Sequence, residues 1–274
     1  MADLSAAWQL ADAWPVERSS IAVVHSGGVD THGDVSFRQR IASLSKPLAA
    51  WAVLIACEEG SISLDDAVGQ TGCTVRHLLA HAGGYPFIGV QPISRPEVTR
   101  VYSNTGFDML AEHVEHATGI AFVEYLDDAV FAPLGMFNSA LEGSCAKDVF
   151  STAEDLVLFV HELRSPTLIA RETYLEAVQP VFPSLSGVLP GFGSMDPCPW
   201  GLGVEIRGHK SPHWTGSRNS ASTFGHYGGI GTFMWVDPVA NIACVMLAER
   251  EVDEWGAQYW PPFSDAVLAS LGRV

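Results

Sequence analysis

The order of apolar and polar residues predicts strands near the N-terminus and a buried helix after them. Apolar side chains recur at helical spacing over residues 4–14, and residues 20–25 form an apolar run typical of a strand. Residues 34–40 are the expected hairpin partner of this strand. Residues 43–59 are apolar on most faces of a helix, which predicts a buried helix that ends at Gly60.

Helices dominate the middle of the chain. Loops that contain glycine and proline separate helical patterns at residues 74–80, 106–118, 121–130 and 152–164. Ser151 and Glu154 fit a capping box at the start of the last helix. Residues 180–199 are rich in proline, glycine and serine and are expected to form a loop.

The C-terminal part returns to strands, at residues 201–207, 231–236 and 242–248, before a closing helix at 255–271. Asp237-Pro238 and Asn241 supply a turn between the last two strands. The predicted fold class is therefore α/β in the α+β sense, with one antiparallel sheet flanked by helices and built from both termini. We expect one compact unit, in which residues 1–60 and 197–274 form the sheet region and residues 61–196 a mostly helical insertion.

Composition indicates a folded protein and disfavours two classes of partner. Of the 274 residues, 47% are hydrophobic and 17% are charged, which is the reverse of the balance in disordered chains. The 31 acidic and 15 basic residues give a net charge of −16, which repels phosphate backbones and anionic lipid. We therefore expect neither a nucleic-acid partner nor a membrane partner.

Cysteine usage and the N-terminal sequence favour a cytoplasmic protein. The five cysteines are scattered without a C-x-x-C pair, so neither a disulfide framework nor a zinc site is indicated. No basic segment followed by a long apolar stretch opens the chain, and no apolar run approaches the ~20 residues of a spanning helix. The sequence does not indicate the oligomeric state.

The motifs of several enzyme classes are missing. The chain has no G-x-S-x-G, no G-x-x-x-x-G-K-[ST] and no G-x-G-x-x-G followed by a suitable acid. His77/His81 and His113/His116 are spaced so that each pair could share a helix face, but neither has the glutamate of H-E-x-x-H or an evident third ligand. We expect no metal site and no cofactor.

An S-x-x-K motif, Ser43-Leu44-Ser45-Lys46, stands at the start of the predicted buried helix. Residues three apart lie on one face of a helix, so the serine hydroxyl and the lysine amine can meet. A serine becomes a nucleophile when a neighbouring base takes its proton, and a lysine in apolar surroundings has a lowered pKa that suits this task. The helix N-terminus also favours developing negative charge.

A second S-x-x-K, Ser144-Cys-Ala-Lys147, lies in a loop-like segment ahead of the better helix start at Ser151. A short motif on its own is only a hypothesis. We expect Ser144 and Lys147 to belong to a solvated loop without a part in catalysis.

Two further segments could complete a site. In Tyr102-Ser103-Asn104 an extended turn points the first and third side chains the same way, which places a phenol beside an amide that can hold a substrate. Residues 225–231, GHYGGIG, lead into a strand, where glycines allow a ligand to approach a bare backbone N–H. Each pattern alone also fits an ordinary turn or bulge.

Together and in this order, the three segments resemble the serine β-lactamase and penicillin-binding protein superfamily, in particular its class C β-lactamase-like branch with esterases and D-aminopeptidases. The resemblance spans roughly residues 36–249. RIASLSKPLAAWAVL resembles the nucleophile helix of the family, VYSNTGFDMLAEHVEHATG its second motif, and TFGHYGGIGTFMWVDP its third motif and strand. The resemblance implies a β-lactamase/transpeptidase-like fold and acyl transfer to water through a covalent acyl-enzyme.

The resemblance also implies residue roles. Ser43 would be the acylated nucleophile, Lys46 its proton acceptor, and Tyr102 the partner of Lys46 in proton transfer and in activating water. Backbone N–H groups of Ser43 and Gly229 would form the oxyanion hole. Substrate binding would involve Asn104, His226 and Gly228.

The third motif departs from that of the lactam-hydrolysing members, which carry Lys-Thr-Gly where this chain has His226-Tyr227-Gly228. A histidine with a reference pKa of ~6.5 is mostly neutral at pH 7, so binding of an anionic β-lactam or D-Ala terminus is expected to weaken. The esterase and aminopeptidase branches often have histidine there. The prediction is a serine hydrolase that acts on small esters or amides, its partner being a small-molecule ester, amide or lactam.

Two alternatives stay open. The chain could be a weak β-lactamase or D-amino-acid peptidase, or a β-lactam-binding sensor or inactive relative that is acylated without turnover. Arg218 is a candidate for replacing the missing cation. Residues 84–100 and 180–200 are expected to form pocket walls, with aromatic candidates for an apolar acyl pocket at Tyr85, Phe87, Phe182, Trp200 and Trp214.

Overall fold

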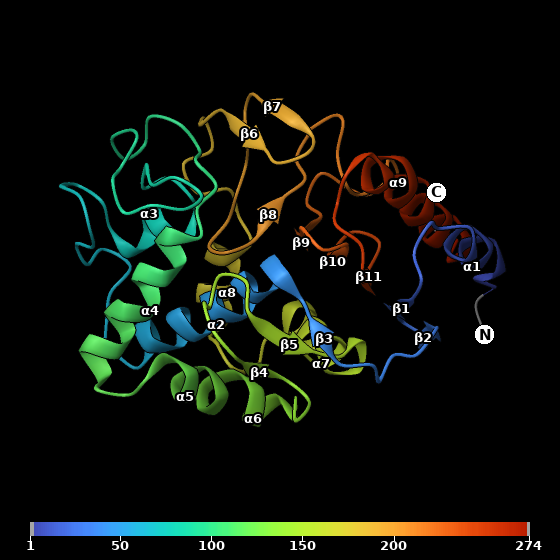
Figure 1. The fold of residues 1–274 in the computed structure, drawn as a ribbon, viewed down its shortest axis with the longest axis horizontal. Coiled ribbons are helices and arrows are strands. Elements are labelled where there is room, and N and C mark those ends of the chain that lie inside the picture. The colour runs from blue at the N-terminus through green and yellow to red at the C-terminus, as the bar shows by residue number, and fades with distance from the viewer. Residues whose placement is uncertain (1–2, 273–274) are drawn as a thin grey trace.

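A six-stranded antiparallel sheet, in the order β2-β1-β11-β10-β9-β8, forms the centre of the computed structural model, which describes residues 3–272 (Figure 1). Strand β1 pairs with β11 from Ser19↔Ala248 to Val24↔Ala243, so the two ends of the chain meet inside one sheet. The predicted sheet built from both termini is confirmed. Its strands are β1 (Ser19–His25), β2 (Gly28–His32), β8 (Glu205–Ile206), β9 (Phe224–Gly228), β10 (Thr232–Asp237) and β11 (Ile242–Ala248).

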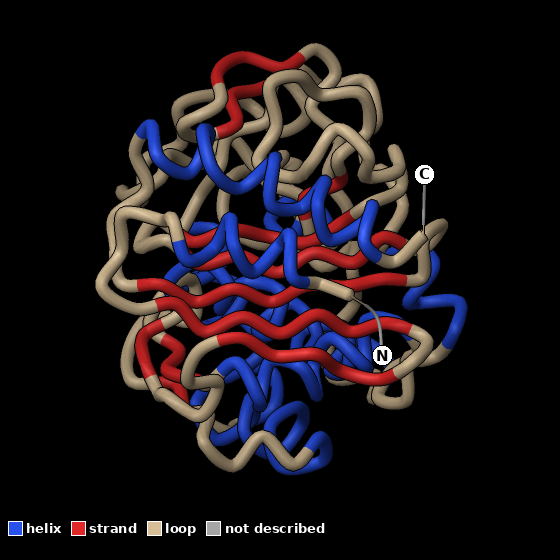
Figure 2. Tube along the Cα trace, turned by 90° about the vertical axis from the view of Figure 1, so that its right-hand side faces the viewer, coloured by secondary structure: helices blue, strands red, loops and turns tan. Residues whose placement is uncertain are grey.

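Helices cover both faces of this sheet. Helices α1 (Ser5–Asp12) and α9 (Glu254–Ser270) contact each other and cross one face, in front of the strands in Figure 2. On the other face, α7 (Ala153–Arg164) contacts β1, β10 and β11. Alternate residues of β11 therefore enter two different cores, with Val245 on the α7 side and Cys244 on the α1/α9 side. Burial on both faces explains why the strand reads as a continuous apolar run.

Helix α2 (Ser45–Glu58) runs through the helical half of the molecule and is buried on nearly every face. It packs against α4 (Thr105–Thr118) and against α5 (Phe122–Leu126), which continues into the wider turn η2 (Asp127–Phe131). The remaining short elements of this half are α3 (Val75–Leu79), α6 (Ala132–Leu134), α8 (Arg171–Ala177) and a small sheet of β3 (Gln39–Arg40), β5 (Val149–Ser151) and β4 (Ala140–Leu141).

Some predicted elements are wrong. The hairpin partner of β1 is β2 rather than residues 34–40, because the chain turns back directly after His25, which pairs with Gly28. Residues 39–40 pair with β5 instead. Residues 180–199 are not wholly a loop, since they contain the hairpin of β6 (Gly187–Leu189) and β7 (Gly193–Met195).

Two smaller predictions also need correction. The cap of α7 is Thr152 rather than Ser151, since the Thr152 side chain accepts a hydrogen bond from the Asp155 N–H. Residues 201–207 contain only the short strand β8. All five cysteines are free thiols. Among residues 3–272, no helix has both the length and the hydropathy needed to cross a bilayer.

Candidate active site

Ser43 lies in a single 3-10 turn, η1 (Ala42–Leu44), immediately before α2. The preceding residue, Ala42, has a φ of 49°, in the left-handed region that side-chain-bearing residues rarely adopt. Strand β9 packs directly on this turn: a Cβ atom on Gly228 would lie 2.8 Å from the carbonyl oxygen of Ile41. The glycine of the third motif therefore lets the strand approach the turn that carries Ser43.

Lys46, one helical turn along, is completely buried. Its Nζ lies 3.4 Å from Ser43 Oγ, 2.6 Å from Asn104 Oδ1 and 2.9 Å from the Ala146 carbonyl oxygen. Burial lowers the pKa of Lys46 from 10.5 to about 7. A neutral amine has two N–H donors and one lone pair. The two carbonyl oxygens accept from the donors, which leaves the lone pair facing the serine hydroxyl.

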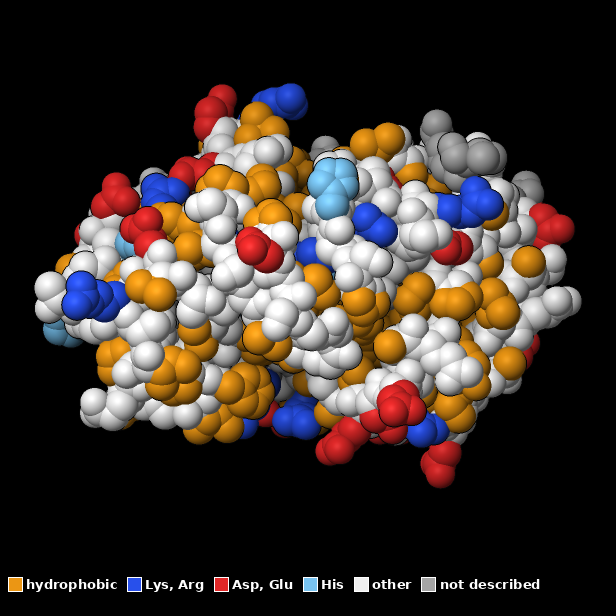
Figure 3. Space-filling view, turned by 90° about the horizontal axis from the view of Figure 1, so that it is seen from above, with side chains coloured by type: hydrophobic (Ala, Val, Ile, Leu, Met, Phe, Trp, Pro, Cys, Tyr) orange, Lys and Arg blue, Asp and Glu red, His pale blue; other side chains and the backbone are white. Residues whose placement is uncertain are grey.

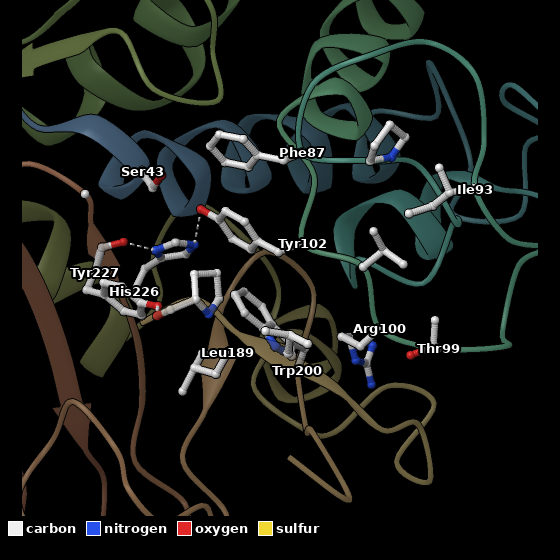
Figure 4. Close-up of a pocket in the computed structure, with 15 residues that line it drawn as sticks. Ser43, Phe87, Ile93, Thr99, Arg100, Tyr102, Leu189, Trp200, His226 and Tyr227 are labelled. Atoms are coloured by element: carbon white, nitrogen blue, oxygen red, sulfur yellow. Dashed lines mark hydrogen bonds between the residues drawn. The ribbon is translucent and has the colours of Figure 1, made fainter. Parts of the chain in front are cut away.

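Tyr102 lies between Ser43 and His226 (Figure 4). Its Oη lies 3.3 Å from His226 Nε2, and His226 Nδ1 lies 2.7 Å from the Tyr227 carbonyl oxygen. A carbonyl oxygen only accepts, so Nδ1 carries the proton and Nε2 accepts from the Tyr102 hydroxyl. Burial, helped by the Lys46 charge, lowers the pKa of His226 to about 3, and burial raises the pKa of Tyr102. Both side chains are therefore uncharged near neutral pH.

The Tyr102-Ser103-Asn104 turn is held by its middle residue. The Ser103 N–H donates to His81 Nδ1 at 3.2 Å, and the Ser103 hydroxyl donates to the Pro86 carbonyl at 2.8 Å. The His81 ring packs on the Tyr102 ring with 4.6 Å between centroids. This arrangement directs the Asn104 side chain at Lys46 rather than into the cavity beside Ser43.

A cavity of about 590 Å³ opens beside Ser43 (Figure 4). Ser43, Tyr102, His226 and Gly229 lie on its lining. Most of the remaining lining is apolar and comes from residues 86–101, the β6–β7 hairpin and the segment before β8, with the side chains Pro86, Phe87, Ile93, Val101, Val188, Leu189, Pro190 and Trp200.

Of the five aromatic residues expected in the pocket walls, only two line this cavity, Phe87 and Trp200. Tyr85 instead packs in the core, where its hydroxyl accepts from the Gln70 N–H. Phe182 stacks on the ring of His77, and Trp214 donates to Glu205 in a buried charge cluster. Composition alone cannot separate these positions, because an aromatic residue suits a core as well as a pocket.

The cavity lining offers no free cation within the described residues 3–272. Arg100 is on the lining, but four of its N–H groups donate to the backbone carbonyls of Ala80, Val181, Phe182 and Cys198 at 2.5–3.0 Å. Arg218 lies elsewhere, in a loop beside α9. Its backbone N–H donates to Asp265 Oδ1 of α9 at 2.7 Å. With a neutral His226, the position of the lysine in the Lys-Thr-Gly motif carries no positive charge.

The second S-x-x-K segment lies in a loop between β4 and β5, as expected, but Ser144 and Lys147 are half-buried rather than fully solvated. The Ser144 hydroxyl donates to Asp108 Oδ1 at 2.5 Å, and Cys145 and Ala146 are buried. The carbonyl of Ala146 in this segment is the one that accepts from Lys46. Sequence reasoning missed Ala146 because a backbone carbonyl has no signature in the side-chain pattern.

The histidine pairs serve local structure. His77 accepts from the N–H of Thr74 at the start of α3 and contacts Glu97, and His113 contacts Asp66. Across the residues that the structure describes, no group of three or more His, Cys, Asp or Glu side chains could hold a metal ion.

Comparisons with known proteins identify the family and the fold of the chain. The Beta-lactamase family model matches residues 19–269. A crystal structure described as a β-lactamase from Mycobacterium bovis superposes with a TM-score of 0.95 and 45% identity, covering 97% of this chain and 99% of that chain. EstCE1, described as a hydrolase with promiscuous acyltransferase activity, superposes with a TM-score of 0.79 and 17% identity over 96% of this chain and 97% of its own.

A curated relative matches only in part. Penicillin-binding protein 4* of Bacillus subtilis is 28% identical over an alignment of 129 positions, which covers 35% of this chain and 29% of that protein. The match therefore spans less than a third of the length of this relative. The family model, by contrast, extends from β1 into α9 and so includes both the sheet and the helical half. The chain belongs to the β-lactamase family and has the fold of its serine hydrolases.

Proposed function

We propose that the protein hydrolyses small uncharged esters or amides through an acyl-enzyme formed on Ser43. The observation that carries this proposal is the pairing of Ser43 with a buried lysine at the lining of an apolar cavity. The 3.4 Å separation of Ser43 Oγ and Lys46 Nζ and the lowered pKa of Lys46 support a base that is about half neutral at pH 7.

In the proposed acylation step, the neutral amine of Lys46 accepts the proton of Ser43 as Oγ attacks the substrate carbonyl carbon. The N–H groups of Ser43 and Gly229 would donate to the oxygen that becomes negative. The leaving alcohol or amine then needs a proton. Tyr102, whose raised pKa keeps it protonated, would give its hydroxyl proton to the leaving group and take one from the Lys46 ammonium.

In deacylation, a water molecule would take the place of the departed alcohol. Tyr102 Oη would accept the water proton as it passes its own hydroxyl proton to the neutral Lys46 amine, while the water oxygen attacks the acyl carbonyl. One proton would return from Lys46 to Ser43 Oγ as the carboxylic acid leaves. Asn104 and the Ala146 carbonyl hold the Lys46 amine in place through both steps. Asn104 thus acts here as a positioning residue for Lys46.

The charge distribution supports an uncharged substrate. No free cation lies on the cavity lining within residues 3–272, and the chain as a whole has a net charge of −16. A carboxylate that enters such a cavity loses its hydration without gaining an ionic partner. The exclusion of anionic substrates would follow from His226 being neutral at the third motif.

The test compares Ser43→Ala with Ser144→Ala, the serines of the two S-x-x-K segments. Turnover of p-nitrophenyl acetate is expected to fall at least about a thousandfold in Ser43→Ala. A fluorophosphonate is expected to add one adduct to the wild type and to Ser144→Ala, and none to Ser43→Ala, as read by intact-mass spectrometry. Retention of activity and of the adduct in Ser43→Ala would refute the proposal.

A second candidate function is β-lactam hydrolysis, which the 45% identity to a protein described as a β-lactamase favours. The two functions separate in a comparison of nitrocefin with p-nitrophenyl butyrate as substrates. A large preference for nitrocefin would reverse the ranking. A stable penicillin adduct without product release would instead indicate acylation without turnover.

A further inference from the structure

Exposed large apolar side chains are concentrated beside the mouth of the cavity. Within residues 3–272, eight such side chains are more than half exposed, and six belong to the two segments that wall the cavity. We call these six the apolar rim; they are Phe87, Ile88, Val90, Ile93 and Val98 of loop 86–98 and Val188 of β6. Figure 3, seen from the side of the β6–β7 hairpin, shows apolar side chains across this face.

Three side chains of the rim are exposed on the surface and also line the cavity. Phe87, Ile93 and Val188 line the cavity and are also 52%, 67% and 59% exposed. Phe87 and Ile93 (Figure 4) come from one segment and Val188 from another, so the mouth has apolar residues from two separate parts of the chain. The apolar lining therefore continues onto the surface. A substrate that ends inside the cavity would leave this rim in contact with water, which is unfavourable.

The rim is preformed. The Ile93 N–H donates to the Gly84 carbonyl at 2.9 Å, the Gly89 N–H to Thr105 Oγ1 at 3.1 Å, and the Asn104 N–H to the Phe87 carbonyl at 3.0 Å. The Glu97 N–H donates to the Ala82 carbonyl at 3.0 Å, so the start, the middle and the end of the loop are each tied to the body of the protein. A surface that is already in place adds affinity without an ordering cost.

We propose that the apolar rim binds the distal part of a long uncharged acyl chain, whose proximal part fills the cavity while its carbonyl lies at Ser43. This inference rests on the proposed function, because it assigns the acyl half of the same ester. The acyl group remains on Ser43 after the alcohol has left. It is therefore the part of the substrate that a fixed apolar channel can hold in both steps.

The expected gain follows from the surface covered. A methylene taken fully out of water contributes about fourfold in binding, and one that lies on an open surface with half its area covered contributes about twofold. Between butyrate and decanoate, six methylenes enter the cavity or lie on the rim. Six methylenes at about twofold or more each predict that kcat/KM rises by about sixtyfold or more over this interval.

The experiment measures kcat/KM for p-nitrophenyl esters from acetate to dodecanoate, each below its aggregation concentration, and a second series repeats the long esters above it. The readout is the ratio of the decanoate to the butyrate value. We expect this ratio to fall about threefold or more in Ile93→Ser and in Val188→Ser, which alter the rim from two separate segments. The matched control is Val239→Ser, since Val239 is 72% exposed in the β10–β11 turn, at the opposite end of β10 from Gly229. Its ratio is expected to equal that of the wild type.

Three outcomes would overturn the proposal: a ratio near one in the wild type, a ratio that the rim variants leave unchanged, or a gain that appears only above the aggregation concentration. The last result would indicate that the rim contacts the surface of aggregated substrate rather than a single acyl chain. A further series of alkyl acetates lengthens the alcohol half of the ester instead of the acyl half. An increase of kcat/KM with chain length in that series, without one in the acyl series, would also overturn the proposal. Thermal melting confirms that each variant is folded. The Ser43 requirement for acetate hydrolysis tests the proposed function separately, so the two can fail independently.

Discussion

Replacing Gly228 by alanine should disturb Ser43 without touching any atom of the proposed catalytic groups. A Cβ atom at Gly228 would collide with Thr232 Oγ1 and would lie 2.8 Å from the Ile41 carbonyl oxygen and 3.1 Å from Ala42 Cβ. These atoms lie where η1 and the residue before it pack against β9 and β10, a contact that we call the seam. The Thr232 hydroxyl donates to the same Ile41 carbonyl at 2.9 Å. The new methyl group would therefore also break this hydrogen bond.

The magnitude can be worked from these contacts. Overpacking a tight interior site costs about 1–3 kcal/mol, and loss of one buried hydrogen bond costs about 1 kcal/mol more. We therefore expect Gly228→Ala to lose about 2–4 kcal/mol in free energy of unfolding. Relief of the clash requires η1 to move away from β9, and a shift of about 1 Å in a reacting group can cost a hundredfold in rate.

The assay combines urea unfolding with kcat for a short ester and the rate of fluorophosphonate labelling. The matched control for stability is Gly229→Ala, where a Cβ atom would meet nothing within 4 Å and φ is not in the left-handed region. Its free energy of unfolding is expected to change by less than about 0.5 kcal/mol. If Gly228→Ala is as stable as Gly229→Ala, the packing argument is wrong. If it is destabilised but is labelled at the wild-type rate, the seam does not position Ser43.

Three further predictions concern Lys46, Ser144 and Lys210. Because the pKa of Lys46 falls from 10.5 to about 7 on folding, kcat/KM should rise with pH around a midpoint near 7. Between pH 7 and 10.5 the Lys46 amine should hold a proton in the unfolded state that it lacks in the folded state. Stability should therefore increase with pH through this window in the wild type and lose that component in Lys46→Met, as urea titrations at several pH values would reveal. Ser144→Ala removes the bond to Asp108 and should lower kcat by about threefold to tenfold with the KM little changed; an unaltered kcat would exclude a positioning role for this loop. Lys210→Met leaves Glu205 buried without its ammonium partner and should cost about 3–5 kcal/mol in urea unfolding, whereas a loss below 1 kcal/mol would contradict the buried ion pair.

Local spacing was sufficient to predict several features. The continuous apolar runs of β1 and β11 indicate strands because the sheet is covered on both faces, and the apolar helix from Ser45 is buried as its composition implies. Ser43 and Lys46 meet because three residues make nearly one helical turn, a geometry set by the backbone itself.

Contacts between distant segments decided the rest. Ala146 reaches Lys46 across 100 residues of sequence, and Asn104 is turned toward the lysine because Ser103 is tied to His81. The hairpin that carries Val188 reads as a loop in sequence and becomes a cavity wall only when it folds over β9.

The sequence by itself therefore determined strands β1, β10 and β11, the buried helix and the Ser43–Lys46 pair, because each depends on neighbours within a few residues. Only the tertiary structure decided which nitrogen of His226 carries its proton, how far the pKa of Lys46 falls and where the cavity opens. Those properties depend on burial and on hydrogen-bond partners from separate segments, which the local pattern of residues does not specify.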